Sequence, residues 1–339
     1  MIRSMIWRTS LFVFLIAAGS LLAVLTIDYR RFVITPVTLP AERITLDIPK
    51  GTSLRSLARR MTDQGILRHP WYFVALAYLQ GDQVRIKAGE FELTANMTPP
   101  RVLQRITSGQ VIEYSIVLVE GWTFRQALAT IDAHPQFGGD ALARLTDQAL
   151  MSQLGRTGEH PEGRFFPDTY RFPGTTKGLD VLRRALERMD RVLAEEWQTR
   201  RPDLPIGTPY EALILASIIE KETAVPAERP QIGGVFVRRL QKGMRLQTDP
   251  TVIYGLGERY DGNLRRADLR EANPYNTYAI NGLPPTPIAL PGRESIRAAL
   301  QPQDGDSLYF VARGDGSHEF SGTLEAHNRA VRRYILGKP

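Results

Sequence analysis

Residues 208–223, TPYEALILASIIEKET, form the segment from which the rest of this chain is best interpreted. Thr208 followed by Glu211 has the spacing of a capping box, and the intervening Pro209 suits the first turn of a helix. Residues 212–219 are apolar apart from one serine, so this helix has no obvious solvent face. The segment therefore predicts a helix buried inside a folded domain.

The predicted helix ends in two acids, Glu220 and Glu222, although the helix dipole favours cations there. A locally unfavourable choice of this kind is typical of a functional position. Glu222 follows Ile218 and Ile219 at helical spacing and extends the apolar stripe, whereas Glu220 extends the side of Ser217. Burial on the apolar side would raise a carboxyl pKa and favour a general acid. Taken alone, the same pattern also fits an exposed glutamate in a fraying last turn.

The composition is that of an ordinary globular chain. Hydrophobic residues make up 43% and charged residues 23% of 339, which argues against wholesale disorder and against a polytopic membrane protein. The absence of cysteine excludes disulfide scaffolds, thiolate nucleophiles and thiolate metal sites. A net charge of +7 suits nucleic acid, an anionic lipid surface or a carboxylate-bearing polymer.

A charge-free run, LFVFLIAAGSLLAVLTI, occupies Leu11–Ile27 and is long enough to predict a membrane span. No A-x-A-like cleavage site follows it, which favours an uncleaved anchor over a signal peptide. A buried core helix is the remaining alternative. Arg3 and Arg8 precede the run while Arg30 and Arg31 follow it, so charge gives only a weak preference for the N-terminus inside. An anchor makes lipid or a cell-surface polymer a better partner than nucleic acid.

Two prolines stiffen Thr35–Pro40, which predicts an extended spacer after the anchor. A strand is then expected over Ile44–Ile48, followed by a turn at Gly51 and a helix capped by Ser53. This order resembles the opening of the LysM peptidoglycan-binding module, with Thr52 where that module usually has aspartate. A generic strand, turn and capped helix explains the same residues.

Three polar blocks follow the buried helix: Leu246–Gly255 (LQTDPTVIYG), Ala272–Tyr278 (ANPYNTY) and Gly282–Ile288 (GLPPTPI). They are rich in amides, hydroxyls, tyrosines and prolines. We expect rigid loops of the kind that hydrogen-bond sugars and stack on them.

The blocks SIIEKET, RLQTDPTVIYG, YNTY and GLPP together resemble the YceG-like family of endolytic murein transglycosylases. Their spacing is preserved from Glu162 to Asn328, and the likeness covers essentially the whole soluble chain. The family's catalytic acid matches Glu222, in agreement with the argument from helix faces. The resemblance implies a lyase that leaves a 1,6-anhydro-muramic acid end.

In such a lyase the sugar's own 6-hydroxyl is the nucleophile, so one carboxyl can act as acid and then as base, whereas a hydrolase normally needs two. The resemblance assigns this role to Glu222. No cofactor and no metal site are expected, because His318 and His327 lack metal-ligand spacing. The predicted substrate-binding residues come from the polar blocks: Gln247, Thr248, Asp249, Tyr254, Tyr275, Asn276, Thr277 and Tyr278.

The predicted fold class is α+β, with a single transmembrane helix, a small LysM-like α/β subdomain and a larger α+β catalytic domain. The expected divisions are 1–31 for the cytoplasmic tip and anchor, 32–42 for a linker, 43–112 for the LysM-like subdomain and 113–339 for the catalytic domain. The catalytic domain should lie in the periplasm, held at the cytoplasmic membrane. Expected partners are peptidoglycan glycan strands, the membrane and, from the resemblance, cell-wall synthases (penicillin-binding proteins), with no nucleic acid.

Two other functions remain open. A hydrolytic muramidase would use Glu222 together with Asp249. A non-catalytic peptidoglycan-binding scaffold for cell-wall synthases would keep the LysM-like unit but would not need a buried glutamate. The products separate the enzymes, because hydrolysis leaves a reducing sugar and transglycosylation does not.

Overall fold

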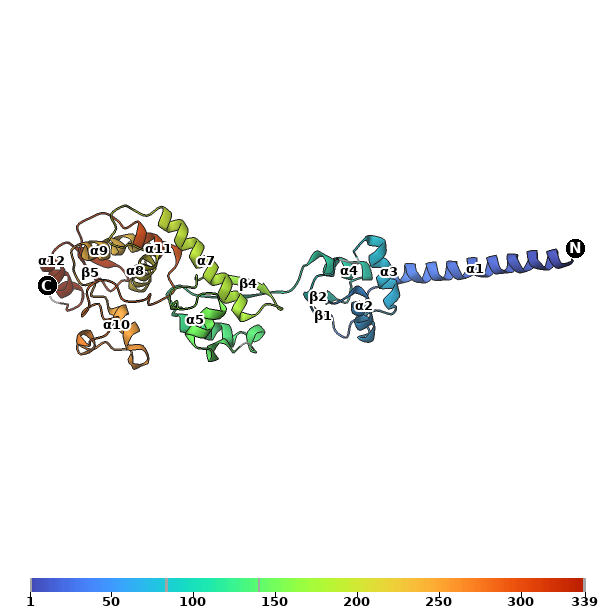
Figure 1. The fold of residues 1–339 in the computed structure, drawn as a ribbon, viewed down its shortest axis with the longest axis horizontal. Coiled ribbons are helices and arrows are strands. Elements are labelled where there is room, and N and C mark those ends of the chain that lie inside the picture. The colour runs from blue at the N-terminus through green and yellow to red at the C-terminus, as the bar shows by residue number, and fades with distance from the viewer. Residues whose placement is uncertain (1, 83–84, 140, 338–339) are drawn as a thin grey trace. The chain divides into compact units, whose positions relative to one another are not determined.

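The computed structural model describes residues 2–82, 85–139 and 141–337 (Figure 1). The chain divides into unit 1, residues 1–114 with 171–175, and unit 2, residues 115–170 with 176–339. Each unit has its own hydrophobic core. The chain mixes helices with short two-stranded sheets, which agrees with the predicted combination of helix and sheet.

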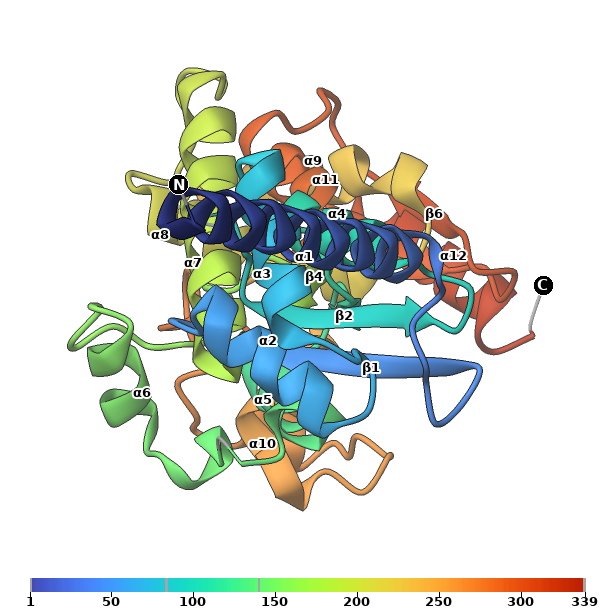
Figure 2. The same ribbon diagram turned by 90° about the vertical axis from the view of Figure 1, so that its right-hand side faces the viewer.

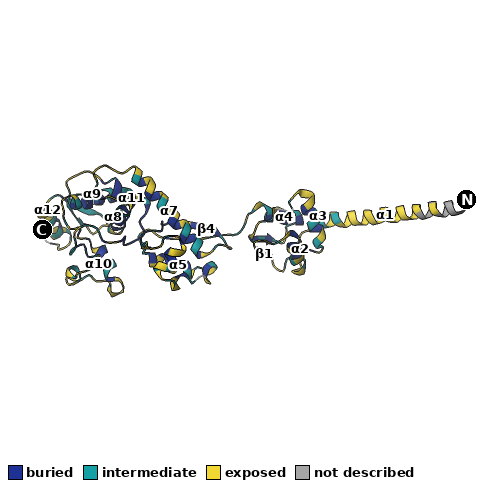
Figure 3. Cartoon of the chain, in the orientation of Figure 1, coloured by how far each residue is buried: buried dark blue, intermediate teal, exposed yellow. Residues whose placement is uncertain are grey.

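The first helix, α1, runs from Ile2 to Ile34. Among the described residues, its segment Leu11–Ile34 is the candidate membrane span, and none of its apolar window is buried (Figure 3). Its length and composition fit a single-pass anchor. The exposure of these side chains argues against a core helix.

Unit 1 contains a two-stranded antiparallel sheet (Figure 2). Arg43 of β1 faces Thr94 of β2, and Ile48 faces Gly89 at the other end of the pair. Two helices lie between these strands in sequence, which gives the order strand, helix, helix, strand. The elements after α1 are β1 (Arg43–Ile48), α2 (Leu54–Asp63), α3 (Pro70–Gln80), β2 (Gly89–Thr94) and α4 (Pro99–Ser108).

The expected spacer belongs to the folded part of unit 1. The helix continues past Arg31 to Ile34, and Phe32 packs against the core of the unit. Val37 is buried in that core, and its N–H donates to the carbonyl of Met97 at 2.8 Å. The prolines do make the segment extended, but apolar side chains between them fasten it to its neighbours.

The strands β3 (Glu113–Val117) and β4 (Thr169–Pro173) form a second two-stranded sheet, and the division between the units crosses both of them. Unit 2 is mainly helical. Its α-helices are α5 (Phe124–Ala133), α6 (Asp147–Gln153), α7 (Gly178–Gln198), α8 (Pro209–Glu222), α9 (Arg229–Gln241), α10 (Asp249–Leu256), α11 (Arg293–Leu300) and α12 (Leu324–Tyr334). Its 3-10 helices are η1 (Pro135–Phe137), η2 (Leu142–Arg144), η3 (Pro226–Glu228), η4 (Gly257–Arg259) and η5 (Asp268–Arg270), and its hairpin is β5 (Tyr309–Ala312) with β6 (His318–Ser321).

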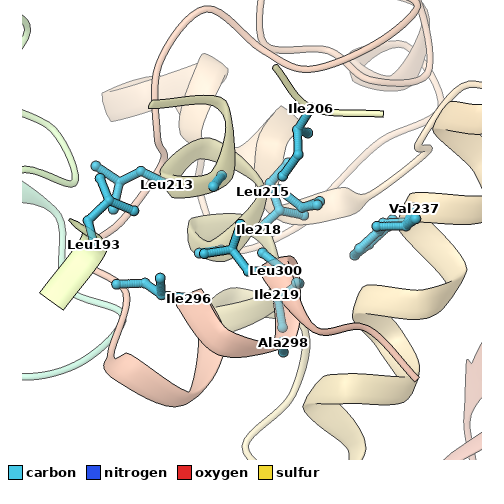
Figure 4. Close-up of a cluster of buried hydrophobic side chains, with 14 of the residues drawn as sticks. Leu193, Ile206, Leu213, Leu215, Ile218, Ile219, Val237, Ile296, Ala298 and Leu300 are labelled. Atoms are coloured by element: carbon cyan, nitrogen blue, oxygen red, sulfur yellow. The ribbon is translucent and has the colours of Figure 1, made fainter. Parts of the chain in front are cut away.

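The core of unit 2 is built around α8. All residues from Ala212 to Ile219 are buried, as the sequence predicted, and α9 and α11 pack against them (Figure 4). The approach of α9 to α11 is close, because a Cβ on Gly233 would lie 2.4 Å from the carbonyl oxygen of Ala298. Such packing holds α8 rigidly, and its last residue carries the carboxyl discussed next.

Candidate active site

Helix α8 begins as its sequence predicted. The Thr208 hydroxyl accepts from the backbone N–H of Glu211 at 3.2 Å, and the Glu211 carboxylate accepts in return from the N–H of Thr208 at 3.2 Å. Fourteen residues later the helix ends at Glu222, which is partly buried. A capped, fully packed helix fixes the position of this terminal carboxyl.

The two acids at the end of α8 have different environments. The Glu220 carboxylate is buried and accepts from the Arg229 guanidinium at 2.9 Å and from the N–H of Gly292 at 2.9 Å. On the same side, the hydroxyl of Ser217 donates to the carbonyl of Ile214. Glu220 is therefore saturated by structural contacts, whereas Glu222 faces an open cavity.

That cavity has a volume of about 420 Å³ and brings together several segments of unit 2, including Arg239 of α9 and the loop at Tyr278. The end of α8, the loop before α10, the hairpin strand β5 and helix α12 each contribute to its wall. It is large enough to accept part of a sugar chain. Its lining residues are Glu222, Arg239, Leu246, Gln247, Thr248, Asp249, Tyr278, Tyr309, Phe310, Leu324, His327 and Asn328.

Burial raises the pKa of Glu222 to about 7. The hydroxyl of Thr248 donates to the Glu222 carboxylate and opposes this rise, while the negative charge of Asp249 adds to it. Electrostatic interactions with His318 and Arg239 lower the pKa of Glu222 by smaller amounts. A carboxyl with a pKa near 7 exchanges its proton readily near neutral pH, as a general acid and base requires.

Arg239 holds the loop that faces Glu222. Its guanidinium donates to the carbonyls of Leu246 at 2.8 Å and Arg245 at 3.1 Å, and to the Gln247 side chain at 3.3 Å. Gln247 has a φ of 53°, which is a costly backbone conformation for a residue other than glycine. The loop before α10 is thus fixed by a buried cation in a shape that the chain would not adopt unaided.

The structure places four of the eight predicted substrate-binding residues at the cavity, namely Gln247, Thr248, Asp249 and Tyr278. The Tyr278 hydroxyl donates to the Asp249 carboxylate at 2.7 Å, which joins two of the polar blocks. These residues line the same cavity as Glu222. Their role in substrate binding stays a prediction.

The other four predicted residues support the wall without lining the cavity. Tyr254 donates to Glu162 at 3.1 Å, and the hydroxyls of Tyr275 and Thr286 lie 2.8 Å apart. The Asn276 amide donates to the backbone carbonyl of Glu271 at 2.8 Å. Buried Thr277 accepts from the N–H of Thr248 at 3.0 Å. Each of these side chains thus has a hydrogen bond within the protein, and its predicted role in substrate binding stays a prediction.

The block Leu246–Gly255 is not the loop that its composition suggested. Helix α10 starts at Asp249, preceded by Thr248 at the N-cap position and with Pro250 in its first turn. An acid and a proline suit the first turn of a helix, so Thr-Asp-Pro is itself a helix start. Only the residues before Asp249 lie outside the helix, and among them Gln247 and Thr248 line the cavity beside Glu222.

Sequence reasoning missed the part of the cavity wall that β5 and α12 form. Tyr309 and Phe310 come from β5, while His327 and Asn328 come from α12. The His327 ring stacks on Tyr309 at a centroid distance of 5.2 Å, and burial lowers the pKa of His327, which keeps it neutral at pH 7. A Tyr-Phe pair in a short strand is a weak signal in the sequence, and only the fold brings these residues to Glu222.

A second carboxyl, Glu162, has a pKa that burial also raises to about 7. It is 3% exposed and accepts from the N–H of Phe124 at 2.8 Å as well as from the hydroxyl of Tyr254. These contacts fix the start of α5. Glu162 is enclosed by protein, whereas Glu222 lines the cavity. Only Glu222 is therefore placed to contact a substrate.

Comparisons with known proteins agree with this arrangement. The model of the YceG-like family matches residues 46–333, and the chain belongs to this family. An endolytic murein transglycosylase of Bacillus subtilis (strain 168) is 31% identical over 91% of this chain and 90% of its own length. An endolytic murein transglycosylase of Streptococcus pneumoniae serotype 2 is 26% identical over 87% of this chain, which spans 59% of that protein. A crystal structure of a YceG-like protein from Listeria monocytogenes, 33% identical, superposes with a TM-score of 0.56 and covers 85% of this chain and 98% of its own.

Proposed function

We propose that this YceG-like protein is an endolytic peptidoglycan lytic transglycosylase and that Glu222 is its acid/base. The observation that carries the proposal is a carboxyl with a pKa of about 7 at the wall of an open cavity. The names of the curated relatives supply the substrate class, since murein is peptidoglycan. The proposed bond is the MurNAc–GlcNAc glycosidic bond within a strand.

The chemistry follows from one carboxyl. Protonated Glu222 gives its proton to the glycosidic oxygen as the bond to C1 of MurNAc breaks. The 6-hydroxyl of the same sugar then attacks C1, and the Glu222 carboxylate takes the proton of that hydroxyl. The strand ends in 1,6-anhydro-MurNAc, and Glu222 is protonated again for the next turnover.

A hydrolytic muramidase is the competing reaction, because Asp249 also lines the cavity. That carboxylate accepts from the Tyr278 hydroxyl, and in the proposed reaction it positions substrate. Mass spectrometry of fragments released from purified glycan strands tests the choice. Anhydro ends lack one water relative to reducing ends, so fragments with reducing ends alone would establish hydrolysis. No fragments from a folded protein would favour the scaffold function.

The activity should fall with rising pH because only protonated Glu222 can act as the acid. Above a pKa of about 7, kcat/KM is expected to drop about tenfold for each pH unit. Initial rates on defined glycan strands between pH 5 and 9 measure this. A profile that stays flat to pH 9 would contradict a general acid with this pKa.

Thr248→Val provides a matched test of the same pKa. The variant removes the hydroxyl that donates to the Glu222 carboxylate and stabilises its charged form. The pKa of Glu222 should rise further, so the alkaline limb of the kcat/KM profile should move to higher pH. A shift to lower pH would mean that the titrating group is not Glu222.

We propose that unit 1 assists glycan engagement as a LysM-like module. The strand, helix, helix, strand order of β1, α2, α3 and β2 supports this, as does a polar cavity of about 400 Å³. Asn96 and Gln104 line that cavity with amides that can bond sugar hydroxyls. Asn96→Ala with Gln104→Ala should weaken cosedimentation with purified sacculi while leaving cleavage of short soluble strands unchanged. Unaltered cosedimentation would give the cavity another role.

The proposed location is the cytoplasmic membrane, with α1 retained as an anchor and everything after Arg31 in the periplasm. A charge-free run without a cleavage site supports this. A reporter enzyme active only in the periplasm, fused after Pro339, should be active, and an inactive but well-expressed fusion would contradict the orientation. Cell-wall synthases are proposed partners in ending strand elongation, to be tested by crosslinking in membranes.

A further inference from the structure

Helix α3 is apolar on the side that faces solvent as well as on the side that faces the core. It contains no charged residue, and its sequence is PWYFVALAYLQ. Trp71 is 54%, Tyr78 56% and Leu79 76% exposed. A helix that is apolar all round is normally enclosed by protein or lipid. The described part of unit 1 covers only one side, which consists of Tyr72, Phe73, Leu76 and Ala77.

The level of α3 along the anchor is fixed by direct contacts. The hydroxyl of Tyr72 donates to Asp28 of α1 at 2.9 Å, and the rings of Tyr29 and Phe32 each lie 5.5 Å from that of Tyr72. Asp28 is the first charged residue after the apolar run Leu11–Ile27. That run spans about 25 Å at 1.5 Å per residue, close to the thickness of a bilayer core.

With α1 inserted as an anchor, these contacts would place the start of α3 where the hydrocarbon core ends and the headgroup region begins. In Figure 1 α3 runs across the end of α1, so the helix stays close to this level. Tryptophan and tyrosine are enriched at this depth because their rings are apolar and their N–H or O–H groups are polar. The exposed residues of α3 have this composition.

Positive charge accompanies the apolar surface. A cavity of about 220 Å³ beside the end of α1 is lined by Arg31, Arg68 and His69, together with Asp28. Both arginines are exposed, and neither pairs with a carboxylate within the part of the chain that the structure describes. Two unpaired guanidinium groups at headgroup level match the phosphate of an anionic lipid.

We propose that α3 is a second membrane contact, with Trp71, Tyr78 and Leu79 in the interface and with Arg31 and Arg68 on lipid phosphate. This contact seats the part of unit 1 that follows α1 on the bilayer and holds it at a fixed orientation to the membrane surface. The inference rests on the proposed retention of α1 as a membrane anchor. It adds a lipid surface to the glycan as a partner of unit 1.

The lack of native cysteine makes the test direct. Single variants Tyr78→Cys, Ile16→Cys and Thr45→Cys of the full chain, each labelled with a small fluorophore, are placed in phosphatidylglycerol vesicles. Ile16 lies within the span and reports the anchor, while exposed Thr45 of β1 reports the water-facing sheet. Lipids brominated near the headgroup or deep in the chain serve as quenchers.

The Tyr78 label should lose emission mainly with the shallow bromines, the Ile16 label mainly with the deep ones, and the Thr45 label with neither. Quenching of the Ile16 label without quenching of the Tyr78 label would overturn the inference. It would show that α1 is inserted but that α3 does not contact lipid, so that its exposed side would be a surface for a protein partner. No quenching at Ile16 would show instead that α1 is not inserted, and the lipid contact of α3 would fall with it.

The charge is tested in the same vesicles. Arg31→Gln with Arg68→Gln in the Tyr78→Cys background should reduce the shallow quenching, and so should phosphatidylcholine in place of phosphatidylglycerol. Equal quenching in all these cases would remove the phosphate contact from the proposal. Quenching of the Ile16 label serves as the reference for equal insertion throughout.

Discussion

Replacing Glu222 with glutamine should reduce glycan cleavage by about 10²–10⁴-fold, the usual contribution of general acid–base catalysis. Glutamine keeps the volume and can still accept from the Thr248 hydroxyl, so the cavity is preserved. It cannot give a proton to the glycosidic oxygen or take one from the 6-hydroxyl. Release of anhydro-ended fragments from glycan strands, followed by mass spectrometry, is the measurement.

The pH dependence of stability provides an independent reading of the same variant. Glu222 has a folded-state pKa of about 7 against an ordinary value of 4.5, so between these values the folded protein holds a proton that the unfolded chain releases. The free energy of unfolding therefore falls as pH rises through this window. Glu222→Gln removes that loss and should gain stability relative to wild type at pH 8, on the order of 1–2 kcal/mol. Thermal melts at pH 5 and pH 8 show this difference.

Glu162→Gln is the matched control, because burial raises the pKa of Glu162 to the same value. Glu162 is enclosed and contacts Phe124 and Tyr254, so the change should alter stability but spare the activity of the folded protein. The assignment of Glu222 would be refuted if Glu222→Gln cleaved glycan at a near-wild-type rate while Glu162→Gln lost activity. Glu162 would then be the better candidate for the acid.

Local chemistry explains why part of this site could be predicted from sequence. The capping box of Thr208 and Glu211 depends on residues three positions apart, and it sets the start of α8. Once the start is set, helical periodicity separates Glu220 from Glu222 without any knowledge of the fold. The structure confirms that Glu220 is taken up by internal contacts, while Glu222 lines the cavity.

The rest of the site depends on contacts distant in sequence. The wall formed by Tyr309 and His327 lies about a hundred residues from Glu222, and no local pattern pairs them. The role of Arg239 could not be predicted from sequence either. Basic residues are common in the last turn of a helix, and only the structure shows that this one is buried and donates to backbone carbonyls. The polar composition of Leu246–Gly255 concealed the helix start at Asp249.

The largest expected effect on stability comes from Glu220, the acid of α8 that does not line the cavity. Glu220 and Arg229 form a buried ion pair at 2.9 Å, and Glu120 lies 3.5 Å from the same guanidinium. Glu220→Ala leaves the buried guanidinium of Arg229 without this carboxylate and leaves the N–H of Gly292 without its acceptor. Breaking such a pair from one side costs about 3–5 kcal/mol, and the remaining Glu120 places our expectation at the lower end. Denaturant unfolding measures it.

Replacing both partners shows whether the loss of stability comes from an unpaired buried charge or from the lost attraction between Glu220 and Arg229. Glu220→Met with Arg229→Met leaves no buried ion, so it should unfold at a denaturant concentration closer to wild type than Glu220→Ala does. If the double variant is the less stable of the two, the attraction itself outweighs the cost of burying both charges. Because α8 carries Glu222 two residues further on, each variant that folds should retain the alkaline limb of kcat/KM near pH 7. Movement of that limb would show that the ion pair also sets the position of the catalytic carboxyl.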